Sequence, residues 1–344
     1  MISFLDFVNK NQLIQICRVI FYHFCQLVLK NKNKSKLLLI LNKVDTIAIH
    51  NELKKKNRIM FQTARIFLNR FSLSSFRTLR RNSATKTRRK LTETTEKNGI
   101  REIILNDPRT RHSLSMDMMA ELYNEITRNL ENEALRVIVL SSTGPVFSAG
   151  HNLKEISDVG PEKSRKIFDR LLSIIKAIQK APVPVIAKVD GLVTGAGCQL
   201  IASCDMVICS ERSSFRLATA DIGIFASTPA VAITRVMPRM KSFHMLFTGL
   251  PLNSSDAYIA GLVSCVARKN DLDNEVALIC ENISNKSRIV MQIGKQFFYK
   301  QLEMDIWDAY MLAEEVLVKN LKMNDAQEGL ESFFEKRSPK WTNS

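Results

Sequence analysis

Two short segments rich in small residues constrain the fold of this chain most, because each follows an apolar stretch typical of a buried strand. Residues 147–155 (FSAGHNLKE) follow the apolar run 136–140 (RVIVL). Residues 195–200 (GAGCQL) follow the run 183–189 (VPVIAKV), which has the same character. A strand that ends in small residues and opens a helix leaves backbone N–H groups unpaired. The two segments together therefore predict a site where two backbone N–H groups hold one oxygen atom.

The glycines and alanines in these segments suit such a site. Gly150, Gly195 and Gly197 permit tight turns and close approach of the backbone. Ala149 and Ala196 keep bulky side chains away from it. Small residues before a helix are also a common packing device, and either segment alone fits that role equally well. The ordered pair favours a binding site.

Other motifs, spread from residue 100 to residue 341, occur in a specific order. They are 106–114 (NDPRTRHSL), 144–151 (GPVFSAGH), 182–186 (PVPVI), 195–199 (GAGCQ), 247–249 (FTG) and 327–337 (QEGLESFFEKR). In these motifs and their order the chain resembles the crotonase (enoyl-CoA hydratase/isomerase) superfamily. The resemblance implies an α/β fold, a crotonase-like spiral of ββα units with a C-terminal helical trimerisation region. The core is expected at 91–285 and the helical region at 286–344.

In that family two backbone N–H groups hold the thioester carbonyl of an acyl-CoA, and the motifs match those donors to His151 and Ala196. Removing one such donor typically slows a reaction by about 10²–10³-fold, so an intact pair would strongly stabilise an enolate-like transition state. The resemblance also implies that Ala149 and Gly150 help His151 to bind CoA. The expected partner is therefore an acyl-CoA thioester of fatty-acid metabolism.

Two C-terminal residues extend the CoA site that the resemblance implies. Phe333 and Lys336 match family positions that help to bind the adenine and a phosphate of CoA from a neighbouring subunit. A lysine suits a phosphate group, although it is also an ordinary surface residue. The resemblance further implies a homotrimer or hexamer. Because the chain has no P-loop, no HExxH motif and no metal-ligand spacing of Cys or His, no metal and no cofactor beyond the CoA moiety are expected.

The chain departs from the family pattern at the two glutamates that deliver water in the hydratases. By alignment of the motifs these positions hold Gln199 and Thr219. An amide has no titratable proton near neutral pH, and a threonine hydroxyl cannot accept a proton without a base beside it. Each general acid or base contributes about 10²–10⁴-fold to a rate. Conventional hydration is therefore expected to be nearly abolished.

Several side chains could substitute for the glutamates, and the sequence does not choose among them. If the stretch around Asp221 is extended, alternation places Asp221 and Thr219 on one face, although a salt-bridged aspartate is the commoner case. His112 and His151 titrate near neutral pH, although an exposed histidine in a turn is the commoner case for His151. Cys198 would be a nucleophile only with a stabilised thiolate, and an inert buried thiol is favoured.

The net charge of +16 invites comparison with nucleic-acid-binding proteins, but it is unevenly distributed. Residues 1–59 carry 11 Lys or Arg and 3 Asp or Glu, residues 60–90 carry 9 and none, and residues 91–344 carry 30 and 31. The basic excess therefore precedes the expected core, and no nucleic acid is expected as a partner. The 7 cysteines show no disulfide framework and fit a reducing compartment.

Residues 60–90 have the composition of a mitochondrial transit peptide, because they are rich in Arg and Ser and contain no acidic residue. A disordered basic linker is the alternative. Since this segment begins at Met60, residues 1–59 are interpreted as an N-terminal extension upstream of an alternative start. Their apolar stretch at 13–29 is interrupted by polar residues, so no stable membrane insertion is expected. The predicted location is the mitochondrial matrix.

From residue 100 the pattern alternates between strands and helices. Strands are expected at 100–105, 137–140, 183–189, 206–209 and 262–266, and helices at 115–130 and 160–180, with helices alone after residue 270. Short βα units predict mainly parallel pairing. Three functions stay open at this point: a CoA-thioester isomerase or hydrolase, a non-catalytic CoA-ester-binding or partner protein, and an RNA-binding homologue, since one branch of the superfamily binds RNA.

Overall fold

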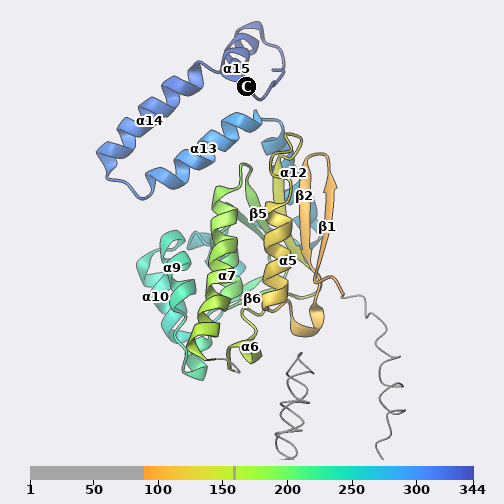
Figure 1. Cartoon of the computed structure of the whole chain (residues 1–344), viewed down its shortest axis with the longest axis vertical. Helices are drawn as coiled ribbons and strands as arrows, with labels where there is room; N and C mark the ends of the chain where they lie inside the picture. Colours follow the sequence, from red (N-terminus) through yellow and green to blue (C-terminus); the bar gives the residue numbers. More distant parts are fainter. Residues whose placement is uncertain (1–88, 158–159) are drawn as a thin grey trace, which may run out of the picture. The chain divides into compact units, whose positions relative to one another are not determined.

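The strands of this chain form two sheets in the computed structural model, which describes residues 89–157 and 160–344 (Figure 1). The larger sheet has the strand order β1-β2-β3-β5-β7-β10. Its strands are β1 (Thr92–Lys97), β2 (Ile100–Leu105), β3 (Val137–Ser142), β5 (Val185–Val189), β7 (Met206–Ser210) and β10 (Cys265–Ala267). The expected N-terminal extension and nearly all of the transit-peptide-like segment lie outside the described residues.

Pairing in the larger sheet is parallel except between β1 and β2. These two strands form a hairpin whose turn residues, Asn98 and Gly99, have φ angles of 53° and 75°. An Asn-Gly pair with two positive φ angles is the usual two-residue hairpin turn. The predominance of parallel pairing confirms the prediction from short βα units.

A smaller sheet with the order β4-β6-β8-β9 completes the strands of the described residues. Its members are β4 (Val146–Ser148), β6 (Leu192–Thr194), β8 (Ser214–Arg216) and β9 (Leu252–Asn253). Sequence patterns did not predict these strands, because two or three residues are too few to show a period. The correction matters for the site: the small-residue segments follow β4 and β6, and not the longer strands β3 and β5 directly.

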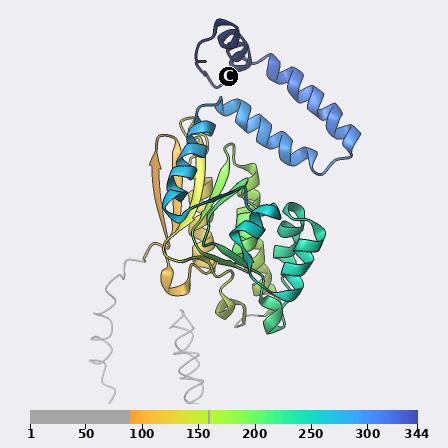
Figure 2. The same ribbon diagram turned by 180° about the vertical axis from the view of Figure 1, so that it is seen from behind.

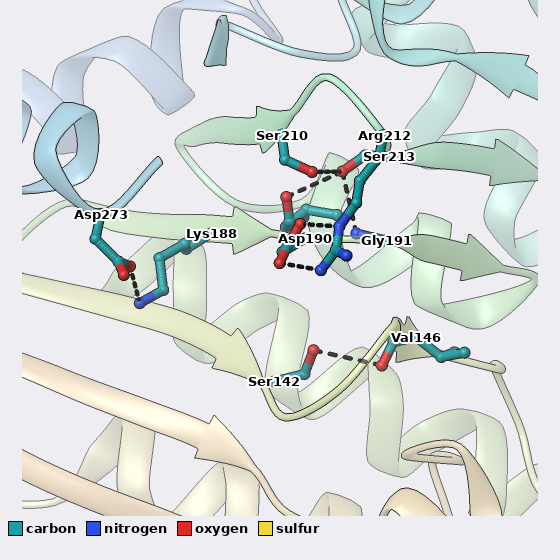
Figure 3. Close-up of polar contacts among 10 residues, drawn as sticks. Ser142, Val146, Lys188, Asp190, Gly191, Ser210, Arg212, Ser213 and Asp273 are labelled. Carbon is teal, nitrogen blue, oxygen red and sulfur yellow. Dashed lines mark hydrogen bonds and ion pairs between the residues drawn. The ribbon is translucent and has the colours of Figure 1, made fainter. Parts of the chain in front are cut away.

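A polar network holds the corners where the chain passes from the larger sheet to the smaller one (Figure 3). The Gly191 N–H donates to Ser213 Oγ at 3.1 Å, and that hydroxyl donates to the Val189 carbonyl at 3.0 Å. Beside them, Arg212 forms a bidentate ion pair with Asp190. The network fixes how β6 and β8 leave β5 and β7, and it therefore sets the position of the loop that follows β6.

Helices cover both faces of the larger sheet. In Figure 1, α5 (Met116–Thr127) and α7 (Pro161–Lys180) lie side by side on one face, and α12 (Leu272–Ser284) lies on the other, as the reverse view in Figure 2 shows. The side chains of β3 alternate between the two faces of the sheet, so this strand contributes to the core on each face. Ile138 and Leu140 belong to the cluster under α5 and α7, and the neighbouring Val137 and Val139 pack with α12.

Helix starts follow the sequence signals closely. Ser115 caps α5, since its Oγ accepts the Met118 N–H at 3.1 Å. Gly160 precedes α7 and Pro161 occupies its first turn. The bounds of β2 match the predicted strand, whereas β10 begins at Cys265 and not at residue 262.

Five more helices and short turns connect the sheets. They are α6 (Leu153–Ser157), α8 (Ala196–Ala202), α9 (Ser227–Val236), α10 (Arg239–Thr248) and α11 (Ser254–Ile259), with 3₁₀ turns η3 (Pro108–Thr110), η4 (Thr219–Ile222) and η5 (Lys269–Asp271). No helix within residues 89–157 or 160–344 is long and apolar enough to span a membrane.

The described chain ends in helices only, as the sequence predicts. After α12 follow α13 (Arg288–Gln301), α14 (Ile306–Leu321) and α15 (Asn324–Glu335). Helix α13 is fixed to the core by Lys295, whose Nζ donates to Asp205 Oδ2 at 2.6 Å and to the Ile178 and Val183 carbonyls. Helix α14 has no buried residue and exposes large apolar side chains, including Trp307 at 73%. These helices therefore carry apolar surface that one chain alone leaves uncovered.

Candidate active site

The loops after β4 and β6 touch through their backbones. Strands β4 and β6 are parallel neighbours, so their carboxyl ends lie side by side. A Cβ atom built on Gly150 would lie 2.9 Å from the Ala196 nitrogen and 2.9 Å from the Thr194 carbonyl oxygen. Gly150 also has a φ of +79°, which favours glycine. This contact requires glycine at position 150, and it brings together the segments that sequence analysis paired.

The His151 and Ala196 amides are free at this contact. Neither N–H donates to an acceptor among the residues that the structure describes. The amides directly before them are occupied: Gly150 donates to Ser148 Oγ at 3.2 Å, and Gly195 donates to the Arg216 carbonyl at 3.0 Å. Ala196 is the first residue of α8, where helix geometry leaves N–H groups unpaired. Two donors on touching loops are the arrangement that an oxyanion hole requires.

His112 stabilises β4 and the loop that follows it through hydrogen bonds. Its Nδ1 hydrogen-bonds the Val146 carbonyl at 2.7 Å, and its Nε2 lies 3.1 Å from Thr143 Oγ1. Its own carbonyl accepts the Ser148 hydroxyl at 2.8 Å. Burial lowers the pKa of His112, although the hydrogen bond to Val146 opposes that shift. Because both ring nitrogens are engaged, His112 acts as a structural residue in this fold.

His151 is a partly buried histidine whose ring nitrogens are shielded from solvent, so the expectation of an exposed histidine in a turn is wrong. Both ring nitrogens are buried and neither has a hydrogen-bond partner. The ring meets Phe168 of α7 edge-on, with centroids 5.3 Å apart. Burial lowers the pKa of His151 below its ordinary value of 6.5, and a backbone contact with Leu114 opposes this only in part. At neutral pH the imidazole is therefore neutral, with one N–H and one lone pair unpaired.

Gln199 and Thr219, which the sequence analysis matched to the family glutamates, also carry buried unpaired atoms. Gln199 lies one turn beyond Ala196 on α8 and is only 7% exposed, yet its Oε1 has no hydrogen-bond partner. Thr219 Oγ1 is likewise buried and unpaired. Thr219 begins η4 shortly after β8, which pairs Arg216 with Thr194 at the end of β6. Native proteins leave few buried polar atoms unpaired, so this group points to a ligand.

The stretch around Asp221 is not extended, so the condition under which alternation would place Asp221 and Thr219 on one face is not met. Both residues belong to the 3₁₀ turn η4. The Asp221 carboxylate accepts a hydrogen bond from Arg216 Nη2 at 3.1 Å, and its side chain is 55% exposed. Cys198 is a buried thiol that donates to the Val193 carbonyl at 3.3 Å, and burial raises its pKa to about 12. These geometries match the structural roles that the sequence favoured for both residues.

Phe333 and Lys336 lie away from the loops described above. Both belong to the end of α15, which Figures 1 and 2 show at the opposite end of the described chain from α6, the helix that follows His151. Phe333 is 77% exposed, and Lys336 ends the helix with a φ of 55°. One chain therefore does not bring these residues to the paired donors, and their role in a neighbouring subunit stays a prediction.

Two supporting residues were missed by sequence analysis. The Ser148 hydroxyl donates to His112 and also accepts the Gly150 N–H at 3.2 Å, which joins the strand end to the turn. Phe168 packs against His151 from a helix. Neither role has a local sequence signal, because each depends on a contact between segments that are distant along the chain.

The family is defined by comparison with known proteins. The sequence model of the enoyl-CoA hydratase/isomerase family matches residues 95–344, so the chain belongs to that family. Enoyl-CoA hydratase domain-containing protein 3, mitochondrial, of Mus musculus is 44% identical over 255 residues, which are 74% of this chain and 85% of the mouse protein. Its name agrees with the location predicted from the sequence.

Solved structures confirm the crotonase-like fold. The crystal structure of human enoyl-CoA hydratase domain-containing protein 3 has a TM-score of 0.72 and 41% identity, and the match covers 73% of this chain and 100% of the human one. The crystal structure of an enoyl-CoA hydratase from Mycobacterium smegmatis has a TM-score of 0.71 and 36% identity, and the match covers 74% and 99%.

Proposed function

We propose that this protein binds acyl-CoA thioesters in the mitochondrial matrix, within fatty-acid metabolism, and holds the thioester carbonyl between the His151 and Ala196 N–H groups. The observation that carries the proposal is the pair of unpaired backbone donors on touching loops. Neutral N–H donors that are already fixed in place lose little energy on reorganisation when charge develops on the carbonyl oxygen. The site therefore suits reactions that pass through an enolate or a tetrahedral oxyanion.

Conventional hydration is not the reaction that this site favours. Gln199 and Thr219 can donate and accept hydrogen bonds, but neither provides a carboxylate to activate water. Isomerisation and thioester hydrolysis remain as the enzymatic alternatives, because each needs oxyanion stabilisation and one modest base. A non-catalytic CoA-ester-binding or partner protein is the second candidate function, favoured by the same missing carboxylates. RNA binding is a third alternative, and the nearly balanced charge of residues 91–344 disfavours it.

The proposed ligand needs no metal and no cofactor beyond its CoA moiety. Ala149, Gly150 and His151 would line the thioester end, and Phe333 and Lys336 of a neighbouring subunit would meet the adenine and phosphate. The many exposed large apolar side chains of α13–α15 support a homotrimer or hexamer, since such side chains are commonly covered at an interface.

The proposal is tested by binding and turnover of crotonyl-CoA on the full chain. The parent is compared with a double variant, Gln199→Glu with Thr219→Glu. We expect the parent to bind crotonyl-CoA without hydrating it, and the double variant to gain hydration. Failure of the parent to bind any acyl-CoA would refute the proposal. Hydration by the parent would show instead that another group supplies the acid–base chemistry.

A further inference from the structure

The titratable side chains around the paired loops are nearly all engaged. His112 uses both ring nitrogens to hold the first loop. Asp221 is paired with Arg216, and the Cys198 thiol is buried and protonated. Glu155 accepts the Met116 N–H at 2.9 Å through one oxygen and the Asn152 side chain at 3.3 Å through the other. Asp221 Oδ1 lies outside the ion pair, but it belongs to a side chain that is 55% exposed.

His151 differs from all of them, because both of its ring nitrogens are buried and unpaired. Leaving a buried donor or acceptor unsatisfied is unfavourable, because the group loses its hydrogen bonds to water without gaining others. Such a cost is expected where a ligand later supplies the partner. Phe168 restricts the ring on one side, which limits the loss of freedom when a ligand binds. The imidazole is neutral at neutral pH because burial lowers its pKa, so one nitrogen retains a free lone pair.

The same residue also supplies one of the two proposed oxyanion donors through its backbone. Because the N–H and the imidazole belong to one residue, a thioester oxygen bound at the His151 N–H would lie within a side chain's length of the imidazole. Gln199 Oε1 and Thr219 Oγ1 are also buried and unpaired. Gln199 lies on α8, which begins at the contact with Gly150, and Thr219 follows β8, the strand that pairs with β6. The polar atoms without partners thus come from three segments around a single pair of backbone donors.

We infer that the His151 imidazole is the catalytic base that removes and returns the α-proton of a bound acyl-CoA. The lone pair of one ring nitrogen takes the proton, and the C–H electrons form the Cα=C1 bond of an enolate whose oxygen is held by the His151 and Ala196 N–H groups. The imidazolium then returns a proton to a carbon of the ligand, so that no oxidant, reductant or co-reactant is needed. This inference rests on the proposed function, because the thioester must occupy the paired donors.

The test is deuterium exchange at the α-carbon of butyryl-CoA in D₂O, measured by mass spectrometry with the full chain. His151→Gln removes the base but keeps the backbone N–H, so the affinity for butyryl-CoA should stay within about twofold while exchange slows by about 10²–10⁴-fold. His244→Gln, at an exposed histidine of α10, is the matched control and should exchange like the parent. Asp221→Asn is tested alongside as the competing base.

Each outcome decides the inference. Exchange by the parent that is lost in His151→Gln, with binding retained, supports it. Exchange that persists in His151→Gln, or that is lost in Asp221→Asn, overturns it. A parent that binds butyryl-CoA without exchanging the α-proton also overturns it, while the proposed binding function stands. A parent that binds no acyl-CoA refutes both.

Discussion

Replacing Gly150 by alanine should separate the two loops that carry the proposed oxyanion donors. The new Cβ would lie 2.9 Å from the Ala196 nitrogen and from the Thr194 carbonyl oxygen, whereas ordinary van der Waals contact begins at 3.4 Å. Both neighbours are backbone atoms, which cannot rotate away as a flexible side chain would. The loops must therefore move apart by the difference between these two distances, 0.5 Å.

A shift of this size is enough to disable one donor. Lengthening an N–H···O bond by half an ångström from its optimum takes it beyond the usual limit of about 3.2 Å. A hydrogen bond contributes about 0.5–1.5 kcal/mol net, so the affinity for an acyl-CoA should fall by about 2- to 13-fold. The loss on a charged oxyanion is larger, and α-proton exchange should slow by about 10²–10³-fold.

Gly144→Ala separates the steric effect from the cost of backbone strain. Gly144 has a φ of +71°, close to the +79° of Gly150, but a Cβ there would meet no atom within 4 Å. Both variants should lose about 1–2 kcal/mol of folding stability to backbone strain, because each places an L-residue in the left-handed region, and the steric overlap adds to this loss only in Gly150→Ala. Only Gly150→Ala should also lose affinity for butyryl-CoA, measured by isothermal titration calorimetry. Equal affinities in the two variants would refute the proposed contact between the donor loops.

Three further predictions concern pH, the C-terminal helices and the CoA nucleotide. Burial lowers the pKa of His112 and His151 below 6.5, so below that pH the unfolded chain binds more protons than the folded one. Stability measured by urea unfolding should therefore be highest above pH 6.5 and fall as the pH decreases. The fall should be less steep in His151→Gln. Lys295→Met breaks a buried pair with Asp205 and should cost about 3–5 kcal/mol of unfolding free energy. Lys319→Met, at an exposed ion pair, should cost at most about 1 kcal/mol. Equal costs would contradict the role of Lys295 in anchoring α13 to the core. Phe333→Ala should weaken butyryl-CoA binding by about 2- to 13-fold through lost stacking but leave a pantetheine thioester, which lacks adenine, unaffected; an equal loss for both ligands would exclude a contact with adenine.

Local sequence patterns were enough to predict the main helices, the longer strands and the two small-residue segments. The 20-residue α7 has a helical period and the buried strand β3 has a continuous apolar run, and both signals can be recognised locally. The residues paired as donors, His151 and Ala196, could be named in advance because a backbone N–H depends on the position in a motif and not on the side chain.

The contact between those two segments follows from tertiary packing, which no local pattern predicts. The smaller sheet consists of strands of two or three residues, which have no detectable period, and its parallel pairing of β4 with β6 creates the contact at Gly150. Whether a histidine is structural or free depends on partners that are distant in sequence: His112 meets Val146, whereas His151 meets no hydrogen-bond partner within the described chain. Burial and hydrogen bonding are properties of the packed chain, so no local pattern could assign the two histidines their different roles.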